Sequence, residues 1–128
     1  MKLIGKYGKG GINLEGDAES FCELAQAIRE AGDAREFILT IPSKDAPNPY
    51  PGLADRLVIQ TTNGSVLITR DASRIGITGS SEKLNALAKN IDFAARNAQS
   101  KHQHLEFYPG HFFLAPDSVP LIITRLEK

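Results

Sequence analysis

The chain has 128 residues, a common length for a single domain and long enough to bury one hydrophobic core. Hydrophobic residues make up 41% and charged residues 23%, a globular composition that excludes an intrinsically disordered chain. Lys plus Arg and Asp plus Glu number 15 each, so the formal net charge is zero. Because a nucleic-acid-binding domain usually carries a basic excess, no nucleic-acid partner is expected.

The cysteine content and the N-terminus predict a cytoplasmic protein. The single cysteine, Cys22, cannot form an internal disulfide, which fits a reducing compartment. Residues 1–6 become polar and glycine-rich too early for the apolar run of a signal peptide. No segment reaches the roughly 20 apolar residues of a spanning helix, so we expect no membrane contact.

The N-terminal part of the chain predicts a hairpin followed by a helix. Residues 2–7 and 12–15 are strand-like and flank a glycine-rich turn. Apolar residues at helical spacing come next, with Asp17 or Ser20 as the N-cap and Gly32 as the C-cap. This helix is amphipathic, with a charged opposite face.

The middle of the chain predicts more strands and one long loop. A strand over residues 37–41 leads into residues 42–54, where several prolines predict an irregular loop. Loops of this length are often functional. Residues 57–61 and 66–69 flank Asn63-Gly64, a dipeptide that strongly predicts a β-hairpin.

The C-terminal part predicts a third strand, which extends the hairpin into a meander, and then a helix and two final strands. Residues 74–78 form the strand, and Ser80 or Ser81 caps the helix. One face of the helix is apolar over about five turns: Leu84, Leu87, Ala88, Ile91, Ala94, Ala95 and Ala98. The last strands cover residues 102–107 and 121–126.

The order of these elements predicts the fold class. We expect one α+β domain over residues 1–128, built on a mostly antiparallel sheet of six or seven strands. Both amphipathic helices are expected to pack on one face of that sheet.

Four residues near the C-terminus could ligate a metal. His102, His104 and Glu106 alternate along a predicted strand and so share one face, and His111 follows beyond a turn. Two imidazoles and a carboxylate suit zinc, which would make the protein a small metal-dependent hydrolase or a metal-binding protein. The alternative is that this face is simply solvated.

Other chemistry finds little support in the sequence. Gly10-Gly11 is followed by Ile12-Asn13 and a strand, whereas a P-loop needs Gly-Lys-Ser/Thr at the start of a helix. Gly79-Ser80-Ser81 lacks the second glycine of a nucleophile elbow. We therefore expect no enzyme activity and no cofactor.

The connection over residues 108–118 combines aromatic residues, prolines and a histidine. Large aromatic side chains in a loop can anchor a binding partner. The other interpretation is that Phe112, Phe113 and Leu114 fold inward and close the end of the sheet, because exposed apolar patches are rare.

Parts of the C-terminal half resemble a known family. Residues 74–88 resemble the strand, Gly-Ser turn and helix start of the immunity protein 32 family. The run His104-Leu-Glu-Phe-Tyr-Pro-Gly-His111 is its most specific element, and residues 115–118 and 120–123 continue it. The resemblance thus lies mainly over residues 74–123, and the N-terminal half shows none.

The resemblance implies a small bacterial α+β protein that neutralises a polymorphic toxin without a cofactor or a reaction of its own. The expected partner is a protein. Expected contact residues are His104, Glu106, Tyr108, His111 and Phe112. The zinc site stays open as an alternative, and so does a homo-oligomer formed through an exposed edge strand.

Overall fold

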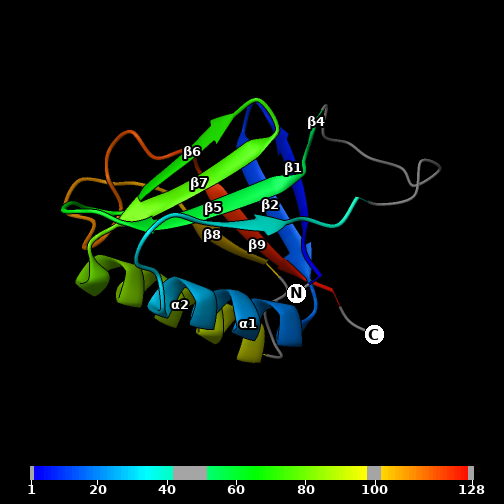
Figure 1. The fold of residues 1–128 in the computed structure, drawn as a ribbon, viewed down its shortest axis with the longest axis horizontal. Helices are drawn as coiled ribbons and strands as arrows, with labels where there is room; N and C mark the ends of the chain where they lie inside the picture. Colours follow the sequence, from blue (N-terminus) through cyan, green and yellow to red (C-terminus); the bar gives the residue numbers. More distant parts are fainter. Residues whose placement is uncertain (1, 42–51, 98–101, 127–128) are drawn as a thin grey trace.

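The computed structural model describes residues 2–41, 52–97 and 102–126 (Figure 1). In these ranges the chain forms nine strands and two helices, so the α+β class is confirmed. The strands lie in two mixed sheets, one of five strands and one of four. Five of the seven strand pairs in these ranges are antiparallel, so the mostly antiparallel arrangement is confirmed, whereas the prediction of one sheet with six or seven strands was wrong.

The first sheet, sheet A, has the strand order β4-β1-β2-β9-β8. Its strands are β1 (Ile4–Gly8), β2 (Gly11–Gly16), β4 (Gly52–Ala54), β8 (His102–Leu105) and β9 (Leu121–Arg125). The predicted hairpin is confirmed, since β1 and β2 pair in antiparallel fashion up to Gly8 and Gly11. Gly11 has φ +129°, and a Cβ there would collide with the carbonyl oxygen of Pro120, so glycine is required.

The second sheet, sheet B, has the order β3-β5-β7-β6. Its strands are β3 (Arg35–Ile38), β5 (Arg56–Thr61), β6 (Leu67–Asp71) and β7 (Arg74–Gly79). The strand expected at 37–41 thus lies earlier in the chain. The loop expected over 42–54 is wrong at its end, where β4 forms, and residues 42–51 lie outside the described ranges.

The predicted hairpin at Asn63-Gly64 is wrong. Strand β5 pairs with β7 in parallel, while β6 pairs with the far edge of β7. The connection instead passes around the end of β7: the Thr62 amide donates to the Gly79 carbonyl and the Ser80 amide to the Gly64 carbonyl, both at 2.8 Å. These contacts carry the chain past β7 before it returns as β6.

The two helices follow the predicted spacing closely. Helix α1 (Ala18–Arg29) is capped by the Asp17 carboxylate, which accepts a hydrogen bond from the Ser20 amide. Its C-cap is Glu30, so the prediction of Gly32 as the C-cap was wrong. Helix α2 (Ser81–Arg96) is capped by the Ser80 hydroxyl. Its predicted apolar face is buried from Leu84 to Ala95, and Ala98 lies outside the described residues.

Both helices lie side by side along one side of the molecule, and the strands lie on the other (Figure 1). Helix α2 contacts β9 of sheet A and β7 of sheet B, so it spans the two sheets. Neither helix is long and apolar enough to cross a membrane, as far as the described residues go.

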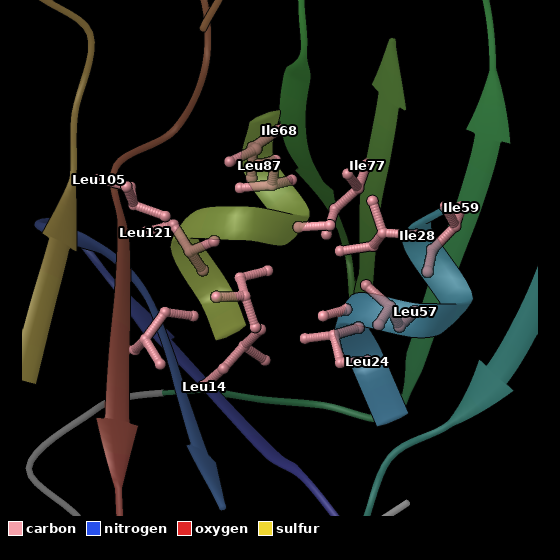
Figure 2. Packing of buried hydrophobic residues seen from close by; sticks show 14 of the residues in the cluster. Leu14, Leu24, Ile28, Leu57, Ile59, Ile68, Ile77, Leu87, Leu105 and Leu121 are labelled. Carbon is pink, nitrogen blue, oxygen red and sulfur yellow. The ribbon is translucent and has the colours of Figure 1, made fainter. Parts of the chain in front are cut away.

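One hydrophobic cluster joins all of these elements. Figure 2 shows side chains from both sheets and both helices pointing toward one another, among them Leu14, Leu121, Leu57, Ile77, Leu24 and Leu87. Burial of each such side chain stabilises the fold by about 1.5–3 kcal/mol. Part of the loop between β8 and β9 stays on the surface around this core, where Tyr108 and Phe112 are exposed.

Candidate functional site

The loop over residues 108–118, called the anchored loop below, is fixed to the start of β6. The Val66 amide donates to the Phe113 carbonyl at 2.7 Å, and the Ala115 amide donates to the Val66 carbonyl at 2.8 Å. The Ser118 hydroxyl donates to the same Val66 carbonyl at 3.0 Å and accepts from the Ile68 amide at 3.1 Å. The loop is thus held by backbone pairing, much like an extra strand segment.

The anchored loop begins with a tight turn. The His111 amide donates to the Tyr108 carbonyl at 2.9 Å, and Gly110 has φ +89°. Pro109 and Gly110 therefore stand at the two central positions of a turn of the type II pattern, which favours proline first and glycine second. The Pro-Gly dipeptide is the signal from which this turn could have been predicted.

His111 organises the middle of the loop. Its Nδ1 atom accepts hydrogen bonds from the amides of Phe113 (3.2 Å) and Leu114 (3.1 Å). Its ring lies between the rings of Tyr108 and Phe113, with centroid distances of 4.7 and 4.6 Å. Burial lowers the pKa of His111 below its ordinary value of 6.5. Because Nδ1 is the acceptor in both hydrogen bonds, the ring is a neutral imidazole with its proton on Nε2.

The aromatic residues of the loop point in two directions, so each of the two interpretations made from the sequence is partly right. Phe113 and Leu114 fold into the core and are 5% and 2% exposed. Phe112 and Tyr108 are 61% and 60% exposed. The loop thus presents two large rings to solvent while its neighbouring residues anchor it.

A lysine that the sequence analysis did not single out completes this surface. The Lys83 ammonium, in the first turn of α2, lies 3.8 Å from the centroid of the Phe112 ring. It also donates to the Phe112 carbonyl at 2.8 Å. The contact fixes Phe112 through a cation–π interaction and a charge-assisted hydrogen bond. Tyr108, Phe112 and Lys83 are called the aromatic surface below.

The two histidines of β8 lie on the outer face of sheet A, as the alternation predicted. His102 pairs with Thr124 and His104 with Ile122 in the β8–β9 register, while Leu105 points into the core. His104 is exposed, and Glu106 lies beyond the end of β8 and is exposed as well.

His102 takes part in a chain of polar contacts that crosses four strands of sheet A, called the polar chain below. Its Nδ1 lies 3.1 Å from the Thr124 hydroxyl, which donates to the Asn13 side-chain oxygen at 2.7 Å. The Asn13 amide donates to the Glu15 carboxylate, which pairs with the Lys6 ammonium, both at 3.0 Å. Because the Thr124 hydroxyl proton is used toward Asn13, Nδ1 of His102 must be the donor.

The structure does not assemble the zinc site considered from the sequence. His102 directs Nδ1 at Thr124, and His111 directs Nδ1 at backbone amides of its own loop. No group of three or more His, Cys, Asp or Glu side chains within residues 2–41, 52–97 and 102–126 is placed to hold a metal ion. His104 and Glu106 are both exposed on the protein surface.

Comparison with known proteins addresses the part of the chain that carries these features. The family model of immunity protein 32 matches residues 74–126. This match confirms the resemblance over that segment, which is less than half of the 128-residue chain. No curated protein and no solved structure shows a significant match.

The immunity protein 32 segment contains β7, α2, β8, β9 and the anchored loop. All three residues of the aromatic surface lie within it, as do His104, Glu106 and His111. In the polar chain, only His102 and Thr124 belong to the segment. The match therefore supports an immunity-protein role, with a protein partner, for the part of the molecule that displays the exposed rings.

Proposed function

We propose that the protein is an immunity protein that neutralises a toxin by direct contact through the aromatic surface, without catalysis. The observation that carries this proposal is that the immunity protein 32 segment includes the whole exposed and anchored aromatic surface.

The physical properties of the surface suit protein binding. Tyrosine and other large residues dominate the energetics of protein interfaces, particularly where they stand near the centre of a contact. Tyr108 and Phe112 are exposed in the free protein, but the turn and the Val66 hydrogen bonds keep their backbone fixed. Little conformational entropy is then lost when a partner binds, and more of the contact energy appears as affinity.

Polar residues around the rings supply a rim. His104 and Glu106 are exposed next to the loop along the chain, and Lys83 adds a positive charge beside Phe112. Rim charges contribute mainly to specificity and association rate, so these residues should tune partner choice more than affinity. His111 acts as a positioning residue, because its imidazole holds the backbone of the loop.

The test begins with the products of the genes that flank this one, each screened for toxicity in bacteria. The purified toxin is titrated with the protein by calorimetry, and protection is measured by co-expression in bacteria. We expect tight one-to-one binding and survival of the cells. Absence of binding and of protection with every neighbouring toxin would overturn the proposal. Light scattering of the free protein separates this function from the alternative of a homo-oligomeric module.

Alanine variants locate the contact. Tyr108→Ala and Phe112→Ala are each expected to weaken toxin binding about 30-fold, the effect of losing roughly 2 kcal/mol at a hot spot. Phe93→Ala is the matched control, because Phe93 is also an exposed ring (60%) in the matched segment but lies near the end of α2. Equal weakening by Phe93→Ala would place the contact elsewhere.

A further inference from the structure

We propose that His111 is a pH-sensitive latch: protonation of its imidazole releases residues 111–114, and this withdraws the aromatic surface from its partner under acidic conditions. The latch itself is a property of the free protein. Its effect on binding rests on the proposed function of the aromatic surface.

The latch depends on the lone pair of Nδ1. This atom accepts from the Phe113 and Leu114 amides at 3.2 and 3.1 Å. A neutral imidazole with its proton on Nε2 offers one acceptor atom, whereas a protonated imidazole has two donors and no acceptor. Protonation would therefore direct an N–H group at two backbone N–H groups, and that arrangement must break.

The surroundings of His111 offer the cation no carboxylate partner. Several charged or titratable residues lie near His111 along the β8–β9 connection or in the elements packed against it. They are Arg70 and Asp71 of β6, Glu82 and Lys83 of α2, His104, Glu106, Tyr108 and Asp117. None of them forms an ion pair with His111 within the part of the chain that the structure describes. The neighbouring Phe112 carbonyl already accepts from the Lys83 ammonium, so a second positive charge here is disfavoured.

The released contacts lead directly to the exposed rings. The Tyr108 ring packs on the imidazole with a centroid distance of 4.7 Å. Phe112 stands in the sequence between His111 and Phe113, and the Phe113 amide loses its acceptor. Val66 still holds the carbonyl of Phe113 and the amide of Ala115, so the change stays within the first half of the loop. Tyr108 then loses the imidazole on which its ring packs, and the backbone after Phe112 loses two hydrogen bonds, so both rings are presented less rigidly even though the turn and the Val66 contacts remain.

The direction of the pH effect follows from burial. The folded pKa of His111 is lowered from 6.5, so at mildly acidic pH the unfolded chain binds more protons than the folded one. The stabilisation that the neutral latch provides is therefore complete above about pH 6.5 and is lost as the pH falls through the lowered folded pKa. Opening of the loop is linked to His111 protonation in the same way, because the open loop, like the unfolded chain, binds the proton more readily.

The experiment compares the full-length protein with two variants by NMR between pH 8 and pH 5. His111→Asn keeps an acceptor, since its Oδ1 stands where Nδ1 stood, but does not titrate in this range. His111→Ala removes the acceptor altogether. His104→Asn is the control, because His104 is an exposed histidine of the neighbouring strand with no part in the loop.

In the unaltered protein, the Phe113 and Leu114 amide signals should shift with the same midpoint as the His111 ring. They should stay constant in His111→Asn, differ at every pH in His111→Ala, and titrate normally in His104→Asn. Amides that do not follow the His111 ring, or that still titrate in His111→Asn, would overturn the latch.

Binding is measured separately with the toxin against which the protein protects cells. We expect affinity to fall about tenfold from pH 7.5 to pH 5 in the unaltered protein, a change of roughly 1.4 kcal/mol, and less than about twofold in His111→Asn. Co-titrating amides without binding at any pH would leave the latch standing and refute the proposed function. Binding of equal pH dependence in both proteins would refute the regulatory role alone.

Discussion

Two histidines of the C-terminal half, His102 and His111, use the same ring atom in opposite ways. Nδ1 of His102 donates to the Thr124 hydroxyl on the outer face of sheet A. Nδ1 of His111 accepts from two amides inside a turn. The first histidine ends a chain of polar contacts between strands, while the second holds one loop together.

This difference shows why residue spacing alone was a poor guide to a metal site: it places strand residues on a face but does not give the direction of a loop side chain. Alternation along β8 correctly puts His102 and His104 on one face. The direction of a loop side chain depends instead on the backbone groups that need a partner, and in the anchored loop those groups are the Phe113 and Leu114 amides. Residues close in sequence therefore serve separate structural tasks.

The largest expected effect tests whether the anchored loop belongs to the core. Phe113→Ala should lower the free energy of unfolding by about 3–5 kcal/mol, because it empties a buried aromatic site. Phe112→Ala, one residue earlier, should change stability by about 0.5 kcal/mol or little more, since its ring is mostly in water. Urea unfolding of both variants provides the comparison. Similar losses in the two would show that the loop does not distinguish inner from outer residues.

The next effect tests the other region, the polar chain. Thr124→Val has nearly the same shape but leaves the Asn13 side-chain oxygen without its donor in a site where Asn13 is only 5% exposed. The free energy of unfolding should fall by about 1–3 kcal/mol, the cost of an unsatisfied buried polar group.

Thr124→Ser is the control for that variant, because it keeps the hydroxyl and loses only a methyl group. It should retain most of the stability in the same denaturation experiment. A valine variant as stable as the serine variant would mean that the polar chain contributes no net stability.

Local signals predicted the helices well and the sheets less well. The caps Asp17 and Ser80 and the 3.6-residue periodicity lie within single segments, so α1 and α2 could be located from the sequence. Asn63-Gly64 is also a local signal, but contacts to Gly79 and Ser80 override it. Division of the strands into two sheets depends on pairings such as β2 with β9, which no local pattern encodes.

The candidate site shows the same division. The sequence located the loop and its aromatic residues, and the Pro-Gly turn could have been predicted from residue type. It did not separate Phe112 from Phe113, because the loop has no periodicity from which an inner face could be assigned. Lys83 was missed since its contact with Phe112 joins positions 29 residues apart.

The smallest expected effect is a difference in stability between substitutions of the two histidines of β8, His102 and His104. His102→Ala removes the donor to Thr124 but leaves the Thr124–Asn13 hydrogen bond, so the loss should be about 0.5–1.5 kcal/mol, the net value of one hydrogen bond. His104→Ala should change stability by less than about 0.5 kcal/mol, as expected for an exposed side chain. Thermal unfolding at pH 7.5 measures both. If His104→Ala is the more damaging variant, the polar chain does not extend to β8, and the outer face of sheet A is stabilised by contacts around Ile122 instead.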